Sequence, residues 1–292
     1  MKKLRKQPLL TLTLLLSALS LSSQSVQAGR NGPDRNDEVP RIQLRDAYEC
    51  SDLQVENTED WLKGQEEVNK LDQLIGPPRH QGSVGWCFSY TARDLLHYQT
   101  QIAPEIGMIA KDYYTGFVGS ITGFLSSNEG GYTYNNLKRT YKNGICEEGF
   151  LNKYATPENV EQVECVRPKI SIKRFGSPKK HLNPHKGRAH ALFSKLDQYL
   201  AQNQMVAIAY NANGLYKDKY RDDNFFTKYQ ANHASSIVGR YFDHQAKKCR
   251  YVIRNSWGTR YNYALSGPQR EGYHTITEED LSISMAEIAV FK

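Results

Sequence analysis

The spacing of apolar residues divides the chain into a first part that predicts helices and a second part that predicts strands. Residues 61–74 mix polar and apolar positions at roughly helical spacing, and the Gly-Pro-Pro sequence at 76–78 breaks the chain after them. Residues 134–141 predict a short helix that ends at the Asn-Gly pair 143–144. After Cys87, large apolar side chains recur at spacings that fit a helix with one buried face, namely Tyr90, Leu95, Leu96 and Tyr98. Cys87 is therefore expected near the amino terminus of a helix.

The second part contains short apolar runs of strand length. Residues 190–200 predict an amphipathic helix, and residues 205–210, 235–238 and 251–254 predict strands. A polar link at 243–248 joins the last two strands, which favours an antiparallel hairpin or meander. Residues 107–131 contain six glycines among aromatic residues, which suits a loop lining a groove better than a regular element.

The amino terminus has the three regions of a secretory signal peptide. Residues 1–6 are basic, residues 9–21 are apolar and rich in leucine, and Val26-Gln27-Ala28 offers small residues for cleavage. The alternative is an uncleaved membrane anchor, but the apolar run is short and is interrupted by Thr and Ser. We therefore expect cleavage after Ala28, a secreted or periplasmic protein, and no stable membrane insertion afterwards.

Charge and cysteine content narrow the classes of protein to consider. The net charge of +7 comes in part from the basic leader, and Lys and Arg form no basic tract or nucleic-acid-binding motif. We expect no nucleic-acid partner. Five cysteines in a secreted chain leave at least one unpaired. If Cys87 is the reactive one, four remain for up to two disulfides, and Cys146 with Cys165 is the pair favoured by its short separation.

Two stretches together contain the groups that thiol-based acyl transfer needs. Cys87 follows a glycine-containing turn and opens a helix, where the positive end of the helix dipole favours a thiolate. The alternatives are a small buried apolar residue or half of a disulfide. His233 precedes a predicted strand and is the candidate partner that takes the thiol proton and later protonates the leaving amine. The alternative for His233 is a structural histidine, since the chain contains eight.

Three further residues complete the candidate site. Asn255 is expected to accept a hydrogen bond from the imidazole of His233, and Trp257 to cover that bond and exclude water. Gln81, together with the backbone N–H of Cys87, is expected to hold a developing oxyanion. His80 lies one residue out of phase and is interpreted as a rim residue. The alternatives are a turn residue for Asn255, a core aromatic for Trp257 and a surface residue for Gln81.

These segments resemble the papain/cathepsin family of cysteine peptidases. The resemblance covers roughly residues 77–292 with gaps and rests on Gln81-Gly82-Ser83, Gly85, Cys87-Phe88-Ser89, Ala92, Gly130-Gly131-Tyr132, Gly144-Ile145, Glu147-Glu148, Asn232-His233-Ala234, Ile237-Val238-Gly239, Arg254-Asn255-Ser256-Trp257-Gly258-Thr259 and Gly272-Tyr273. It implies an α+β papain-like fold of two lobes, one helical with Cys87 and one an antiparallel, β-barrel-like lobe with His233 and Asn255. The active-site cleft lies between the lobes, and Gly130 and Gly131 bind the substrate backbone on one side of it.

Three departures from the family pattern stand out. The family usually has a cysteine where Val84 stands, and its disulfide partner precedes the glycine pair, where this chain has no cysteine. Trp86 precedes the nucleophile position, where the family has serine, and Phe88 follows it, where the family has tryptophan. We expect Trp86 and Trp257 among the substrate-binding residues, with an altered primed side. The residues between Ala28 and Pro78 leave no room for the usual helical prodomain.

The resemblance implies a secreted cysteine peptidase, most simply an endopeptidase, acting through a thioester acyl-enzyme. We expect a signal peptide at 1–28, an N-terminal arm or short pro-segment at 29–60 that restrains activity, and a peptidase domain at 61–292. Protein or peptide substrates and a proteinaceous inhibitor are the expected partners, and no metal or organic cofactor is needed. The alternatives are an exopeptidase or transpeptidase on the same fold, or a catalytically inactive binding protein. Cleavage of end-blocked peptides and loss of turnover in Cys87→Ala discriminate among them.

Overall fold

The computed structural model describes residues 66–126, 129–149, 155–183, 190–216, 231–243, 245–259, 265, 267 and 269–292. The chain divides into two compact units, residues 1–37 and 38–292, and every described residue belongs to the second unit. The expected signal peptide and N-terminal arm lie outside the described residues. Among those that are described, no helix is long and apolar enough to span a bilayer.

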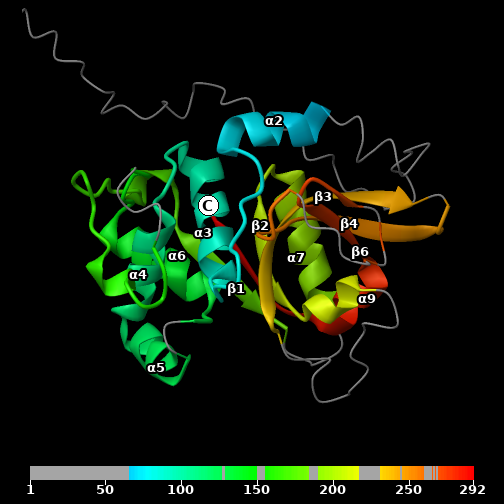
Figure 1. Ribbon diagram of the computed structural model, residues 1–292. Helices are drawn as coiled ribbons and strands as arrows, with labels where there is room; N and C mark the ends of the chain where they lie inside the picture. Colours follow the sequence, from blue (N-terminus) through cyan, green and yellow to red (C-terminus); the bar gives the residue numbers. More distant parts are fainter. Residues whose placement is uncertain are drawn as a thin grey trace, which may run out of the picture. The chain divides into compact units, whose positions relative to one another are not determined.

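The first lobe is helical. Its helices are α2 (Glu66–Ile75), α3 (Cys87–Thr100), α4 (Ile106–Tyr114), α5 (Phe117–Ser126) and α6 (Thr133–Asn143). Helix α3 contacts α4 and α6 on one side and strand β3 on the other, so it lies between the other helices and the sheet (Figure 1). Three short 3₁₀-helices complete the described helical turns of the chain, η3 (Val160–Gln162), η4 (Lys173–Phe175) and η5 (Ala212–Leu215).

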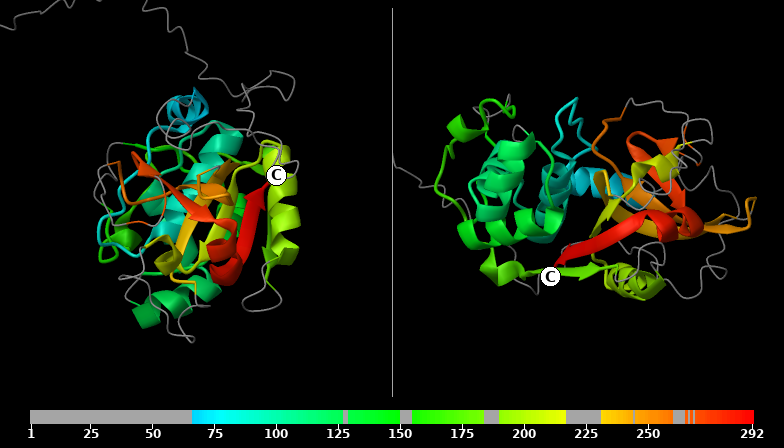
Figure 2. Two further views of the ribbon diagram at one scale, coloured as in Figure 1. Left: turned by 90° about the vertical axis from the view of Figure 1, so that its right-hand side faces the viewer. Right: turned by 90° about the horizontal axis from the view of Figure 1, so that it is seen from below.

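The second lobe is an antiparallel sheet. Its strands are β1 (Pro178–Leu182), β2 (Val206–Tyr210), β3 (His233–Asp243), β4 (Lys248–Arg254), β5 (Gln269–Arg270), β6 (Tyr273–Thr277) and β7 (Met285–Phe291). They follow the order β1-β7-β2-β3-β4-β6-β5, and helices α7 (His190–Ala201) and α9 (Glu278–Ser284) pack against them. The two-lobed α+β class is confirmed (Figure 2). The sheet, however, is open, because the edge strands β1 and β5 are not paired with each other among the described residues.

Most sequence-predicted elements are present, and one prediction is wrong. Helices α2, α3, α6 and α7, strand β2 and the β3–β4 hairpin lie where they were expected. The glycine-rich segment 107–131, expected as a loop, instead contains helices α4 and α5. Two of its glycines allow close packing of these helices: an added Cβ at Gly107 would lie 2.6 Å from the Ala155 side chain, and one at Gly119 would lie 1.8 Å from the Tyr113 carbonyl oxygen.

The disulfides in the structure agree with the pairing favoured by the sequence. Cys146 and Cys165 form a disulfide, as their short separation predicted, and Cys87 is a free thiol. Cys249 is disulfide-bonded as well, to a partner outside the described residues. The bridges therefore leave the candidate nucleophile unpaired.

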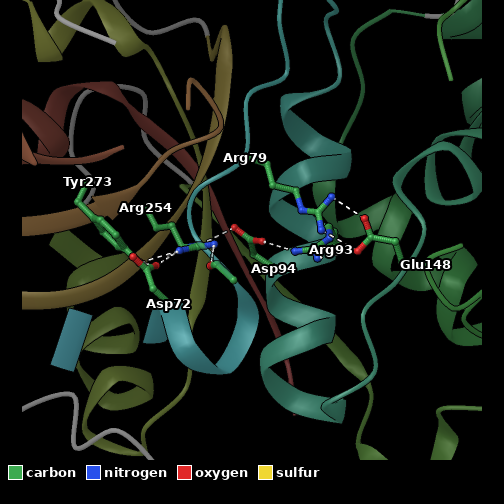
Figure 3. A network of polar contacts seen from close by, with 8 residues as sticks. Asp72, Arg79, Arg93, Asp94, Glu148, Arg254 and Tyr273 are labelled. Atoms are coloured by element: carbon green, nitrogen blue, oxygen red, sulfur yellow. Dashed lines mark hydrogen bonds and ion pairs between the residues drawn. The ribbon is translucent and has the colours of Figure 1, made fainter. Parts of the chain in front are cut away.

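A buried network of charges joins the two lobes (Figure 3). Arg254, at the end of β4, donates from Nε to Asp94 on α3 at 2.9 Å and from one terminal nitrogen to Asp72 on α2 at 2.8 Å. The other terminal nitrogen donates to the Gly76 carbonyl at 2.6 Å, and the Tyr273 hydroxyl bridges Arg254 and Asp72. The Arg254 side chain is fully buried, with every polar edge bonded. Helix α3, helix α2 and strands β4 and β6 are thus held to one guanidinium group.

The network continues across the helical lobe and balances its charges. Asp94 accepts a bond from Arg93 at 3.2 Å, and Arg93 in turn pairs with Glu148 at 3.2 Å. Glu148 also forms a two-point pair with Arg79, at 2.6 and 2.7 Å. These arginines lower the pKa of Glu148, outweighing the effect of its burial. Three guanidinium groups thereby face three carboxylates, which offsets part of the cost of burying Arg93, Asp94 and Arg254.

Replacing Arg254 by Met is expected to destabilise the protein strongly. The substitution keeps much of the side-chain volume but leaves Asp72 without a cation and Asp94 with Arg93 alone, and breaking a buried pair typically costs about 3–5 kcal/mol in the free energy of unfolding. Because burial raises the pKa of Asp72, its carboxyl in the variant takes up a proton more readily in the folded state, so the deficit should shrink as the pH falls. Urea denaturation at several pH values measures both effects.

The control is Arg167→Met. Arg167 also pairs with a carboxylate, Glu147, but its side chain is 74% exposed, so its removal should cost about 1 kcal/mol or less. Equal stabilities of the two variants at neutral pH would contradict the role given to the network.

Candidate active site

Cys87 is the first residue of α3, and its sulfur lies at the junction of the two lobes. The backbone N–H of Ala234, at the start of β3, is close enough to the thiol to act on its pKa. The thiol is partly covered, and burial raises its pKa, with the backbone N–H groups of Ala234, Phe88 and Cys87 itself acting in the opposite direction. Unpaired N–H groups at a helix start suit a developing negative charge on this sulfur.

His233 begins β3, immediately before Ala234, whose N–H acts on the pKa of Cys87. Its ring nitrogen Nε2 lies 2.7 Å from Oδ1 of Asn255. Burial lowers the pKa of His233 to about 4, and the hydrogen bond to Asn255 acts against that shift. The imidazole is therefore neutral in the resting site at neutral pH, with its Nε2–H donating to Asn255 and Nδ1 left as the basic nitrogen.

Asn255 follows directly on β4, and its carboxamide oxygen accepts from three donors. Besides His233, these are the hydroxyl of Ser235 at 3.2 Å and the backbone N–H of Ser256 at 2.8 Å. The carboxamide nitrogen Nδ2 is buried and has no hydrogen-bond partner among the described residues. The hydrogen bonds to Oδ1 consequently determine the orientation of the Asn255 side chain.

Trp257 covers the histidine from one side. Its ring centroid lies 4.9 Å from that of His233 at an interplanar angle of 32°, and 5.6 Å from the ring of His274. His274 is itself buried, which lowers its pKa to about 4, so this second imidazole is also neutral at neutral pH. The indole therefore packs against both imidazoles.

Gln81 links the loop before Cys87 to the loop that carries Asn255. Its side-chain nitrogen donates to the Val84 carbonyl at 2.8 Å, its side-chain oxygen accepts from the Ser256 hydroxyl, and its backbone N–H donates to the Ser256 carbonyl at 2.8 Å. An amide nitrogen carries two hydrogens, so one remains for a further acceptor. His80 is exposed, with Nδ1 accepting from the backbone N–H of Gly82 at 3.1 Å.

The glycine pair is bound to the loop before Cys87 by backbone contacts. Gly130 donates from its backbone N–H to the Gly85 carbonyl at 2.9 Å and accepts at its own carbonyl from the Tyr114 hydroxyl at 3.1 Å. At Gly131 an added Cβ would lie 2.8 Å from the Phe88 ring, so no larger residue fits without a shift. The pair therefore runs close beside the start of α3.

Trp86 occupies a different place from the other candidate residues. Its side chain is only 2% exposed and packs in a cluster with Phe88, Ala110, Tyr113, Tyr114, Val160 and Ala234. It also hydrogen bonds to the Tyr114 hydroxyl, and a small part of it borders a cavity of about 660 Å³ with Tyr90 and Glu105. Trp86 thus supports the segment beneath the cleft more than it lines the surface.

Sequence reasoning brought together Cys87, His233, Asn255, Trp257 and Gln81, and it missed the residues that hold them. Ser235, Ser256 and Tyr114 make the supporting hydrogen bonds. The one available signal was the Ser-Ser pair at 235–236 inside an otherwise apolar strand, since buried hydroxyls usually have partners. Among the described residues, no cluster of three or more His, Cys, Asp or Glu side chains is arranged to hold a metal ion.

The comparisons with solved structures support the fold. The structure of SERA5E from Plasmodium falciparum has a TM-score of 0.52 at 16% identity, over 79% of this chain and 93% of that one. The proform of the Amb a 11 cysteine protease, a ragweed pollen allergen, has a TM-score of 0.50 at 14% identity, over 77% of this chain and 64% of that one. None of the curated proteins is similar enough in sequence to count as a match.

The family comparison covers the segments that contain Cys87, His233 and Asn255. The model of the papain family of cysteine proteases matches residues 60–290, which is most of the chain. The chain therefore belongs to the papain family and is a papain-like cysteine peptidase.

Proposed function

We propose that this peptidase is a secreted endopeptidase in which Cys87 is the nucleophile, His233 the general base and acid, and Asn255 the residue that orients His233. One observation carries the proposal. His233 is held through Nε2 by Asn255, which leaves its Nδ1 available as a base, and the backbone N–H of the next residue, Ala234, acts to lower the pKa of Cys87. Secretion is supported by the signal-like sequence of residues 1–28.

The first step is a proton transfer from Cys87 to His233. Burial disfavours a lone thiolate on Cys87 and a lone imidazolium on His233, as the raised and lowered pKa values express. Moving the proton from Sγ to Nδ1 creates both charges side by side, so each offsets the desolvation of the other. The thiolate then attacks the carbonyl carbon of the scissile bond, and the carbonyl π electrons move onto its oxygen.

The oxyanion requires donors at the start of α3. We assign this role to the backbone N–H of Cys87 and to the second hydrogen of the Gln81 side-chain nitrogen, whose first hydrogen is bonded to Val84. Collapse of the tetrahedral species breaks the C–N bond, and the His233 imidazolium gives its proton to the leaving amine. A water molecule activated by His233 then hydrolyses the thioester and regenerates the Cys87 thiol.

An extended protein or peptide substrate fits the surface beside this site. Gly130 and Gly131 present backbone without side chains next to α3, where an extended peptide can form main-chain hydrogen bonds. Trp257 is assigned to substrate binding, whereas Trp86, which was expected to bind substrate too, is buried and supports the segment from below. A proteinaceous inhibitor would occupy the same cleft, and the arm at 29–60 is the proposed restraint on activity.

An epoxide inhibitor of cysteine peptidases should label Cys87 in the wild-type chain, and labelling should depend on His233. In His233→Ala the thiol has no proton acceptor and burial keeps its pKa raised, so at pH 6 the labelling rate should fall by about 100-fold or more. Peptide mass spectrometry identifies the labelled residue. The rate in the variant should recover only in strongly alkaline solution.

Two controls accompany the labelling experiment. His181→Ala removes an imidazole that is bonded to Tyr199, far along the chain from the site, and should leave the rate unchanged. Circular dichroism checks that both variants are folded. Equal labelling of His233→Ala and the wild type at pH 6 would rule out the proposed pair.

Peptides blocked at both ends should be cleaved internally if the enzyme is an endopeptidase. An open cleft accepts such substrates, whereas an exopeptidase needs a free terminus that it binds at a closed end. Products identified by mass spectrometry from matched blocked and unblocked peptides give the comparison. Cleavage of the unblocked peptides alone, one or two residues from an end, would replace the endopeptidase proposal with the exopeptidase one.

A further inference from the structure

The carboxamide of Asn255 is connected to two buried hydroxyl groups that the mechanism above does not use. The Ser235 hydroxyl donates to Oδ1 of Asn255 at 3.2 Å, and the Tyr210 hydroxyl lies 3.3 Å from the Ser235 hydroxyl. Both side chains are buried, with exposed fractions of 1% for Ser235 and 0% for Tyr210. The hydrogen bonds therefore extend from His233 through Asn255 into the interior of the sheet.

The strand geometry explains why these groups meet. Ser235 stands two residues after His233 on β3, so both side chains project from the same face of the strand. Tyr210, at the end of β2, pairs directly with His233 across the sheet, and the two rings are 5.9 Å apart in an edge-on arrangement. Ser236 projects to the opposite face, where its hydroxyl has no partner among the described residues.

The direction of each bond follows from the number of protons. Ser235 has one hydroxyl proton, which it donates to Asn255, so the Tyr210 hydroxyl must donate to Ser235. Burial raises the pKa of Tyr210, which keeps its hydroxyl protonated and able to donate. The chain of donors thus runs from Tyr210 to Ser235 and ends at the Asn255 oxygen.

We propose, resting on the function proposed above, that Ser235 and Tyr210 are positioning residues that fix the carboxamide of Asn255 and, through it, the proton on Nε2 of His233. A carboxamide can rotate by half a turn and exchange its oxygen for its nitrogen. In this site such a rotation would direct the Nδ2 hydrogens at the Ser235 hydroxyl, the Ser256 N–H and the His233 N–H. The Ser256 N–H and the His233 N–H would then each face a donor, and the Ser235 hydroxyl would lose its acceptor on Asn255, so the oxygen stays toward His233.

Ser235 contributes to this orientation because, among the described residues, the Asn255 side chain is held only through its oxygen, which accepts from the Ser235 hydroxyl and the Ser256 N–H besides His233. Its Nδ2 has no partner in the described part of the chain, so the amide end contributes nothing to its orientation. With the Asn255 oxygen held in place, His233 keeps its proton on Nε2 and offers Nδ1 to Cys87. If the carboxamide rotates, a tautomer protonated on Nδ1 becomes favoured, and that tautomer cannot accept the thiol proton.

The test compares two neighbouring serines that are equally buried, only one of which bonds Asn255. Ser235→Ala removes the hydroxyl that bonds Asn255, and Ser236→Ala makes the same substitution one residue further on at equal burial. Because a neutral hydrogen bond contributes about 0.5–1.5 kcal/mol, kcat for a peptide should fall about three- to tenfold in Ser235→Ala with KM unchanged. Ser235→Thr, which keeps a hydroxyl, should retain most of the wild-type kcat, and Ser236→Ala should resemble the wild type.

A second readout separates this proposal from the proposed function. Nitrogen-15 NMR of His233 reports which ring nitrogen carries the proton, whether or not the protein cleaves peptides. The wild type should show the proton on Nε2, and Ser235→Ala should show a mixture of tautomers. Tyr210→Phe combined with Ser235→Ala removes the tyrosine hydroxyl that would otherwise be left unpaired, and it should give the same mixture if the effect arises at Asn255.

Each outcome bears on one proposal. An unchanged tautomer in both Ser235→Ala and the double variant would overturn the positioning role, as would equal kcat values in Ser235→Ala and Ser236→Ala. A wild-type protein that cleaves no peptide and is not labelled at Cys87 would overturn the proposed function instead. The NMR comparison would then still decide whether Ser235 controls the histidine.

Discussion

The ion pair of Arg254 with Asp94 is the interaction on which the rest of the structure depends. Asp94 lies on α3 seven residues after Cys87, and Arg254 immediately precedes Asn255. The 2.9 Å contact between them therefore fixes the helix that begins at the thiol relative to the strand that ends at the carboxamide. The register of β3 against β4 then places His233 beside Asn255, since Ser236 pairs with Arg254. One buried contact thus sets the relative position of groups from both lobes.

The cost of burying this arginine is offset by the number of groups it bonds. The neighbouring carboxylates of Asp94 and Asp72 and the Tyr273 hydroxyl keep the pKa of Arg254 above its ordinary value despite burial, so the charge is permanent. A permanent charge with a rigid planar fork specifies geometry in a way that an apolar contact does not, because each nitrogen has a required direction. By contrast, Cys87 is partly covered and His233 is buried, and burial raises the pKa of the thiol and lowers that of the imidazole. The permanent charges therefore lie in the Arg254 network, whereas the groups proposed to exchange protons, Cys87 and His233, lie at the candidate active site.

Much of this arrangement could be predicted from sequence, for reasons that differ from residue to residue. Cys87, His233 and Asn255 stand in short strings with recognisable neighbours, and the apolar spacing after Cys87 identified α3. Strand β2 was predictable because it is short, apolar and bounded by polar residues. The helices within 107–131 were not, because glycine lowers helix propensity on its own and its value at Gly107 and Gly119 appears only when another element packs against it. Ser235 and Arg254 were missed as connecting residues, since their partners depend on strand register and on contacts between lobes.

The missing family disulfide near Val84 shows how the same constraint can be met without a covalent bond. The loop before Cys87 and the glycine pair are joined here by the 2.9 Å bond from the Gly130 N–H to the Gly85 carbonyl, and Tyr114 holds the Gly130 carbonyl from the other side. Tyr114 is in turn bonded by Trp86, the residue that departs from the family pattern next to Cys87. The tryptophan thereby supports the segment that the lost disulfide would have held. A thiol nucleophile works only while it is reduced, and a clamp made of hydrogen bonds keeps its geometry under the reducing conditions that preserve that thiol.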